Sequence, residues 1–326
     1  MKALLTGANG FIGSHLAEKL HAMGEELILI DKFCSTHNYI ENLWGAYLLN
    51  FDEMASFLEE NKSRVKYFIH LGANSNTDQN NLSDSINTNI SSSQYVWNYC
   101  SEQKIPLIYA SSAATYGDGS GSFSDRLDSD QLKKIKQTSL YSWTKMYFDL
   151  FSIESSKKGY SPSFWAGLKF FNVYGVNEFH KGSQSSVLHT FTDQIIRENK
   201  ICLFKSHKKG VEDGKQIRDF VSVNYCTDFI VNMMNAPQDS HDNGLYNVGT
   251  GKGKTFLDFV SDFTKSLNID PKIEFVDTPL KLQKHYQYYT QADTDKSKKI
   301  YDYNSFDYHQ DLSDISTRIF NYYKQT

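Results

Sequence analysis

Three glycines close to the N-terminus constrain the fold of this chain more than any other feature. Gly7, Gly10 and Gly13 stand between an apolar run at 2–6 and a helical pattern. Glycines at this spacing permit a tight turn, let the backbone approach a pyrophosphate and bring a helix close to a strand. The free N–H groups at the start of that helix then face the anion. The sequence therefore predicts a β-strand, turn and helix that bind a dinucleotide.

The end of the next predicted strand, at 26–31, bears on which dinucleotide binds. Asp31 closes that strand, where a carboxylate can hydrogen-bond an adenosine ribose. Asp31 favours an unphosphorylated ribose and therefore NAD. Lys32 instead offers a positive charge for the 2′-phosphate of NADP. These two residues leave both cofactors open.

Strands and helices alternate through the first half of the chain, which is typical of a doubly wound parallel sheet. We expect an α/β, Rossmann-like domain over residues 1–170, to which about 219–250 return. Residues 171–218 and 251–326 are less regular, and we expect them to form a smaller substrate-binding domain. The predicted strands of the central sheet are 2–6, 26–31, 65–73, 106–113, 164–172 and 245–250.

A tyrosine and a lysine, Tyr141 and Lys145, are four residues apart in a predicted helix. Positions i and i+4 lie on one helix face, so we expect the ammonium to lower the pKa of the phenol. The strand that ends at Ser112 should bring a hydroxyl to the same place, since ligands of open α/β sheets bind beyond the carboxyl ends of the strands. Such a pair also arises by chance on helix surfaces, and the chain has 21 tyrosines.

Five further stretches narrow the class of enzyme. They are Tyr109–Gly117, Phe171–Gly175, His180–Ser183, Arg218–Val221 and His285–Asp293. Together with the glycine turn, they resemble the ADP-L-glycero-D-manno-heptose 6-epimerases of the extended short-chain dehydrogenase/reductase superfamily, through nearly the whole chain. The resemblance implies a nucleotide-sugar epimerase that oxidises C6 transiently with tightly bound NADP, or alternatively NAD, in the synthesis of lipopolysaccharide core precursors. It also implies a homo-oligomer.

The resemblance assigns roles to particular residues. It implies that Ser112, Tyr141 and Lys145 are catalytic and that Lys181 is a second acid–base group. With the three glycines, the implied cofactor contacts are Phe11, Ile12, Asp31, Lys32, Leu71, Gly72, Ala73, Asn74, Ser75, Asn89, Tyr141 and Lys145. The implied substrate contacts are Asn172, Val173, Ser183, Phe204, Arg218 and Tyr286. The chain departs from the family near Asn38 and Glu53. Family members have lysines that favour NADP aligned near these two positions, and this chain lacks both lysines.

Four of the residues to which the resemblance assigns roles have a structural alternative. Arg218 can form an ion pair with the adjacent Asp219, and Lys181 can be a solvated loop charge. An arginine fork suits a diphosphate equally well. Asn172 can cap a turn at a strand end, and Tyr286 can be part of the core.

Composition excludes several classes of function. The net charge of −4 argues against general binding to nucleic acid. No apolar run reaches the ~18 residues of a membrane span, and the N-terminus enters a strand with no signal peptide visible. We therefore expect a cytoplasmic protein without a metal site, because its cysteines are far apart and form no C-x-x-C motif. They are Cys34, Cys100, Cys202 and Cys226.

Two other functions remain open. A nucleotide-sugar 4-epimerase or 4,6-dehydratase would share most of these motifs. A dehydratase generally carries an acid pair where this chain has Ala113 and Ala114, which counts against it. A non-catalytic redox sensor that binds a dinucleotide is the second alternative. Such proteins often lose the tyrosine–lysine pair that this chain keeps.

Overall fold

A parallel sheet of seven strands forms the centre of the computed structural model, which describes residues 2–32, 37–61, 65–75, 81–119, 121–236, 241–283 and 286–325. Within these residues the strand order is β11-β6-β5-β4-β1-β2-β3. The order reverses between β1 and β4, as in doubly wound folds. The prediction of an α/β, Rossmann-like sheet is confirmed. The strands are β1 (Lys2–Thr6), β2 (Leu27–Asp31), β3 (Tyr47–Asn50), β4 (Val65–His70), β5 (Leu107–Ser112), β6 (Trp165–Phe170) and β11 (Gly244–Val248).

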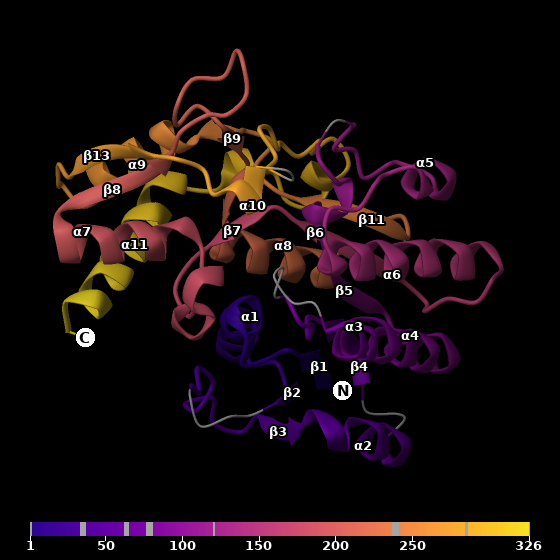
Figure 1. Cartoon of the computed structure of the whole chain (residues 1–326). Coiled ribbons are helices and arrows are strands. Elements are labelled where there is room, and N and C mark those ends of the chain that lie inside the picture. Colours follow the sequence, from indigo (N-terminus) through magenta and orange to yellow (C-terminus); the bar gives the residue numbers. More distant parts are fainter. Residues whose placement is uncertain are drawn as a thin grey trace.

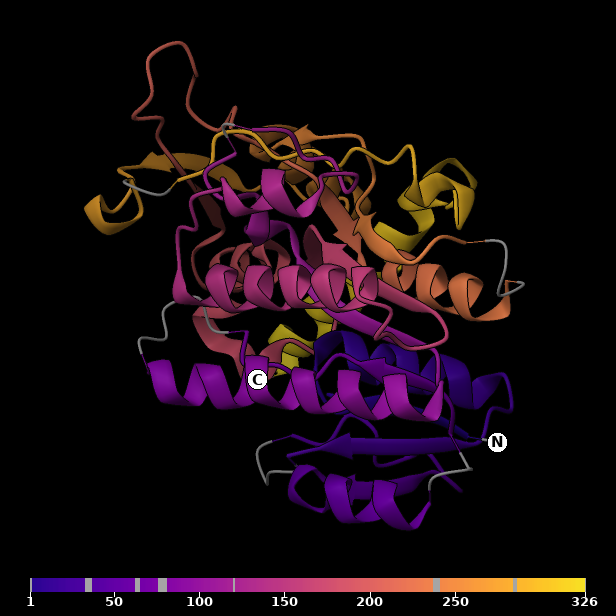
Figure 2. The same cartoon turned by 90° about the vertical axis from the view of Figure 1, so that its right-hand side faces the viewer.

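Helices cover both faces of this sheet, so its strands read as near-continuous apolar runs. On one face, α1 (Phe11–Ala22) and α8 (Val223–Asn235) pack over Ala3 and Leu5 of β1. On the other face, Leu4 packs with side chains of α2, α4 and α6. Figure 2 shows α4, in purple, and α6, in magenta, running side by side across this face. The helices on this face are α2 (Met54–Glu60), α3 (Leu82–Ser85), the π-helical turn η2 (Ile86–Ser91), α4 (Ser92–Gln103), α5 (Ser129–Lys133) and α6 (Leu140–Lys157).

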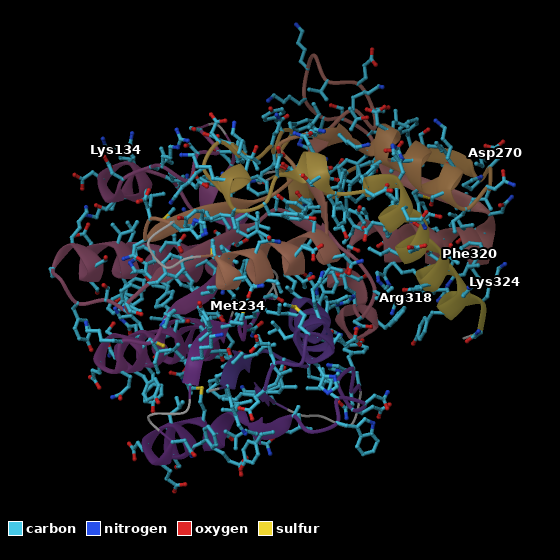
Figure 3. All side chains as sticks on the ribbon, turned by 180° about the vertical axis from the view of Figure 1, so that it is seen from behind. Lys134, Met234, Asp270, Arg318, Phe320 and Lys324 are labelled. Atoms are coloured by element: carbon cyan, nitrogen blue, oxygen red, sulfur yellow. The ribbon has the colours of Figure 1, made fainter. Side chains whose placement is uncertain are left out.

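Later elements form a second layer of structure, coloured from pink through orange to yellow in the upper part of Figure 1. Three two-stranded sheets lie here: β7 (Asn172–Tyr174) with β10 (Phe220–Ser222), β9 (Ile217–Arg218) with β12 (Lys254–Thr255), and β8 (Lys200–Phe204) with β13 (Lys272–Val276). Their helices are α7 (Val187–Glu198), α9 (Phe256–Ser266), α10 (Leu280–Gln283) and α11 (Tyr308–Gln325). Leu312, Ile315 and Ile319 of α11 are buried, as their helical spacing predicts. Figure 3 shows Arg318 and Lys324 of the same helix from behind.

Short 3₁₀ turns complete the described chain: η1 (Phe51–Glu53), η3 (Ala113–Tyr116), η4 (Phe179–Gln184), η6 (Ser297–Lys299) and η7 (Tyr303–Ser305). Among the described residues, no helix combines the length and apolar character needed to cross a bilayer. In the same residues, no group of three or more His, Cys, Asp or Glu side chains is placed to hold a metal ion.

The sequence pattern of Arg218–Val221 predicts a single strand, and the structure corrects this prediction. The chain breaks at Asp219, so that β9 pairs with β12 whereas β10 pairs with β7. The buried carboxylate of Asp219 accepts hydrogen bonds from the backbone of Thr250, Gly251 and Ala292, and this contact fixes the break. The sequence analysis also missed the strands β3 and β13 and the helix α2.

Candidate active site

Ser112, Tyr141 and Lys145 converge where β5 ends and α6 begins. Ser139 caps α6, because its hydroxyl accepts a hydrogen bond of 3.1 Å from a backbone amide in the first turn of the helix. The phenol of Tyr141 hydrogen-bonds Ser112. Lys145 Nζ donates to the carbonyl of Ala110 in β5 at 2.8 Å. The three side chains that the sequence predicts to work together therefore lie together.

The electrostatics of this group differ from the expectation. Burial raises the pKa of Tyr141, and the hydrogen bond with Ser112 only partly opposes this effect. Burial also lowers the pKa of Lys145 to about 8. The predicted lowering of the phenol's pKa by its lysine is not found, because loss of hydration disfavours both charged forms. A lysine with this pKa can change its charge near neutral pH.

A cavity of about 620 Å³ opens over these residues. It reaches from the glycine turn to the end of β5, and most of the predicted cofactor and catalytic residues line it. Those lining residues are Gly7, Gly10, Phe11, Ile12, Gly13, Asp31, Lys32, Leu71, Gly72, Ala73, Ser75, Ser112, Tyr141, Lys145 and Lys181. Two predicted substrate contacts, Asn172 and Val173, line the same cavity.

The glycine turn fits a dinucleotide phosphate. Gly7 has a φ of +72°, and a Cβ there would lie 2.6 Å from the amide nitrogen of Gly72. A Cβ on Gly13 would lie 1.9 Å from the carbonyl oxygen of Gly7, so only glycine lets α1 begin this close to the turn. Gly10 precedes α1 without a capping side chain, which leaves the first amides of the helix available to an anion.

A second cavity of about 260 Å³ continues from the first around Asp31 and Lys32 and reaches Asn74. The Asp31 carboxylate accepts hydrogen bonds of 2.7 Å from the amides of Asn9 and Lys32. Asn89 lines neither cavity. Its side chain accepts from the amide of Asn74 at 2.7 Å and donates to the carbonyl of Asn74 at 3.0 Å, so it holds this loop instead.

Lys181 is not the solvated loop charge that the sequence left open. Its Nζ lies 3.1 Å from Oε2 of Glu178 and 4.2 Å from the centre of the Phe11 ring, and its side chain is 22% exposed. The side chain therefore lies against the cavity that Tyr141 also lines. The predicted contact Ser183 belongs to the same turn, η4, but its side chain is outside the described residues.

Phe204, Arg218 and Tyr286 lie together but are not among the residues that line the main cavity. The Arg218 guanidinium is 5.2 Å from the centre of the Tyr286 ring, which meets Phe204 edge-on. The alternative, an ion pair between Arg218 and Asp219, is wrong. The Asp219 carboxylate accepts hydrogen bonds from backbone amides instead, and no ion pair with Arg218 is found among the described residues. Burial lowers the pKa of Arg218. A guanidinium beside an aromatic ring has the chemistry to bind an anion and a flat ring.

Two acidic residues beside the site were missed by the sequence analysis. Asp149 is four residues after Lys145 on the same face of α6 and forms a fully buried ion pair with Lys169. Glu178 precedes Lys181 by three residues and lines the main cavity. The spacing of each acid from its lysine is the signal that could have found both.

Comparison with known proteins agrees with this geometry. Residues 3–249 match the model of the NAD dependent epimerase/dehydratase family. The chain belongs to this family. It is therefore an enzyme of the class that works with a bound nicotinamide dinucleotide, NAD or NADP.

Relatives within this family confirm the resemblance drawn from the motifs. The chain is 34% identical over 309 residues to the ADP-L-glycero-D-manno-heptose-6-epimerase of Fusobacterium nucleatum, covering 91% of each protein. It is 34% identical over 299 residues to the protein of the same name from Nitratidesulfovibrio vulgaris, covering 90% of each. The crystal structure of the Helicobacter pylori protein of that name has a TM-score of 0.76 at 25% identity and covers 98% of this chain and 96% of its own. A UDP-N-acetylglucosamine 4-epimerase from Methanobrevibacter ruminantium shares the fold, with a TM-score of 0.80 at 21% identity.

Proposed function

We propose that the protein interconverts ADP-D-glycero-D-manno-heptose and ADP-L-glycero-D-manno-heptose by transient oxidation at C6, in the synthesis of lipopolysaccharide core precursors. The observation that carries this proposal is that Tyr141 and Lys181, from α6 and η4, line one cavity beside the dinucleotide turn. An enzyme that serves both epimers needs acid–base groups that reach both positions of one hydroxyl. Relatives named for this reaction support the choice of sugar.

The chemistry follows from the substrate. The C–H bond at a carbinol carbon with no adjacent carbonyl is not acidic, so its inversion cannot begin with simple removal of that proton. The glycine turn and Asp31 would hold a nicotinamide dinucleotide, which would supply the hydride acceptor that this carbon needs and the hydride donor for its return. Tyr141 or Lys181 removes the hydroxyl proton, and Ser112 hydrogen-bonds the oxygen. After the sugar presents its other face, one of these two groups protonates the oxygen again.

For the cofactor we propose NADP, with NAD as the alternative. Lys32 supports NADP, because it lines both cavities beside Asp31 and carries a positive charge. The carboxylate of Asp31 supports NAD. Mass spectrometry of the nucleotide released from the denatured protein tests this choice. NADP alone is the expected result, and NAD alone would reject it.

We assign the nucleotide of the substrate to the cluster of Phe204, Arg218 and Tyr286, and the sugar to Asn172, Val173 and Ser183. Arg218 has a fork that matches a diphosphate, and Tyr286 offers a ring for a base. Residues 171–218 and 251–326 form the substrate-binding domain in this proposal, with 219–250 returning to the dinucleotide domain. The enzyme is proposed to act in the cytoplasm as a homo-oligomer.

The direct test is to incubate the purified protein with ADP-D-glycero-D-manno-heptose and to follow both epimers by NMR. Interconversion without added cofactor is the expected result. No interconversion by protein that contains dinucleotide would reject this substrate. Turnover of UDP- or GDP-hexoses instead would identify a 4-epimerase, whereas dinucleotide binding without turnover of any sugar would favour the redox sensor.

A further inference from the structure

Glu178 is a buried acid in the wall of the main cavity, with an exposed fraction of 1%. Its Oε2 accepts hydrogen bonds from Lys181 Nζ at 3.1 Å and from the amide of Ser186 at 3.0 Å. Its Oε1 is buried and has no hydrogen-bond partner among the described residues. His189 Nε2 lies 4.0 Å from Oε1 but donates to the carbonyl of Gly175 at 2.9 Å. The carboxylate is therefore held by one lysine and one amide.

The charge of Glu178 is balanced by Lys181. Burial lowers the pKa of His189, which is therefore neutral at neutral pH. Apart from this neutral ring, Lys181 is the one basic group within 4 Å of the carboxylate in the described part of the chain. A buried carboxylate needs such a partner, because it has lost its hydration. The Lys181 ammonium also lies over the ring of Phe11, the first residue of α1.

The turn that carries Lys181 is anchored without the carboxylate of Glu178. The amide of Lys181 donates to the backbone carbonyl of Glu178 at 2.9 Å. The neighbouring His180 stacks on His37 with ring centres 4.2 Å apart, and its Nδ1 lies 3.2 Å from the hydroxyl of Tyr39. Backbone and aromatic contacts therefore fix the position of the turn. The carboxylate of Glu178 fixes the position of the Lys181 ammonium.

We propose that Glu178 is the positioning residue for Lys181, holding its Nζ at the cavity and stabilising the ammonium, which donates a proton to the substrate oxygen in one direction of the reaction and forms again in the other. This inference rests on the proposed function. In the step, an N–H bond of the Lys181 ammonium breaks, its proton forms an O–H bond on the sugar oxygen, and the electron pair stays on the amine. The reverse step returns the proton. Glu178 itself does not change its protonation.

The kinetic test compares Glu178→Gln, Lys181→Met and the double variant. Glutamine keeps the shape and can still accept from the amide of Ser186, but it removes the charge. We expect Glu178→Gln to lower kcat by about 10- to 100-fold with KM little changed, which is less than most of the ~10²–10⁴-fold that the acid–base group itself contributes. The double variant should be no slower than Lys181→Met, because Glu178 acts through the amine. Multiplicative losses would overturn the inference.

The pH profile separates positioning from a merely structural role. In the described part of the chain, the titratable groups that interact electrostatically with Glu178 are Lys181, His189, Tyr39 and Tyr323. Burial raises the pKa of Tyr39 to about 12 and also raises the pKa of Tyr323, so both stay neutral near pH 7. An amine that loses a neighbouring carboxylate gives up its proton more readily. The limb of the kcat profile at which the Lys181 ammonium loses its proton should therefore move to lower pH in Glu178→Gln, and an unmoved limb would contradict the proposal.

A measurement without sugar distinguishes failure of this inference from failure of the proposed function. Competitive acetylation with acetic anhydride at pH 7–8, read by peptide mass spectrometry, reports the neutral fraction of each amine. Labelling of Lys181 relative to the exposed Lys134, which lies at the edge of the molecule in Figure 3, should rise in Glu178→Gln. Unchanged labelling would overturn the inference. A rise in labelling with no epimerase activity in the wild type would reject the proposed function alone.

A matched control is available on α5. Asp130 pairs with Lys133 three residues away at 3.4 Å, with both side chains exposed. Asp130→Asn should change neither kcat nor the labelling of Lys181. Bound dinucleotide and the melting temperature of each variant establish that it is folded.

Discussion

Nζ of Lys169 lies 2.7 Å from Oδ2 of Asp149, and both side chains are fully buried. The carboxylate also accepts hydrogen bonds from Tyr109 at 3.1 Å and Ser111 at 2.8 Å, both in β5. This ion pair therefore connects three elements: β5, which ends at Ser112; β6, which carries Lys169; and α6, which carries Tyr141 and Lys145. It lies directly behind the candidate active site.

Lys169→Met should therefore destabilise the protein strongly. It removes one partner of a buried pair and leaves the carboxylate of Asp149 uncompensated, which typically lowers stability by about 3–5 kcal/mol. Urea unfolding monitored by fluorescence measures the change. Lys133→Met, which removes one end of an exposed ion pair, is the control and should leave the unfolding midpoint nearly unchanged. Equal effects of the two substitutions would contradict this interpretation of the buried pair.

Tyr141→Phe should abolish most epimerisation while the protein still retains its dinucleotide. The variant removes one hydroxyl, so the expected loss in kcat is about 10²–10⁴-fold. The measurement is the rate of interconversion together with the amount of nucleotide released on denaturation. A variant that keeps full activity would remove Tyr141 from the proposed chemistry.

Lys145 gives a prediction for stability against pH. Its pKa is about 8 in the folded protein, compared with 10.5 for a lysine side chain exposed to water. Burial disfavours its charged form, so between these values the unfolded chain binds more protons than the folded one, and stability rises with pH. Between pH 7 and 9.5 the free energy of unfolding of the wild type should therefore rise by about 2 kcal/mol more than that of Lys145→Met. Urea unfolding of the cofactor-free proteins at several pH values tests this, and parallel curves would refute it.

Local patterns and one rule of sheet geometry were enough to predict the centre of the site. The glycine turn and the i, i+4 spacing of Tyr141 and Lys145 are local features. The rule that ligands bind beyond the carboxyl ends of parallel strands placed Ser112 beside them. The role of Lys181 was predicted from the family resemblance alone. No spacing in the sequence indicates that η4, which carries Lys181, lies close to the glycine turn in space.

Other parts depend on contacts that the sequence does not reveal. Asp219 ends one strand and begins another because its carboxylate binds the backbone of residues 250, 251 and 292. β3 was missed because Tyr47 and Leu48 are both exposed and give no alternating pattern. The direction of the pKa shift of Tyr141 depends on its burial, which outweighs the attraction expected from Lys145.

Arg218→Met should raise KM for the nucleotide sugar about tenfold or more and change kcat little. The guanidinium has no carboxylate partner among the described residues, so its removal leaves no unpaired acid behind. Charge-assisted hydrogen bonds to a diphosphate are strong, and their loss appears as weaker binding. Arg197→Met, which removes the partner of Asp193 on the surface of α7, is the matched control and should leave KM unchanged. A normal KM in Arg218→Met would place the diphosphate elsewhere.

Gly13→Ala tests the dinucleotide turn by adding a single methyl group. The new Cβ would lie 1.9 Å from the carbonyl oxygen of Gly7, so either α1 or the turn must move. Because the first amides of α1 are the proposed phosphate site, we expect the purified variant to lose most of its bound nucleotide. Gly121→Ala, where a Cβ meets nothing within 4 Å, is the control and should retain it. Absorbance of the nucleotide released on denaturation, measured per protein chain, separates the two outcomes. Full retention in Gly13→Ala would show that the phosphate does not bind at this helix.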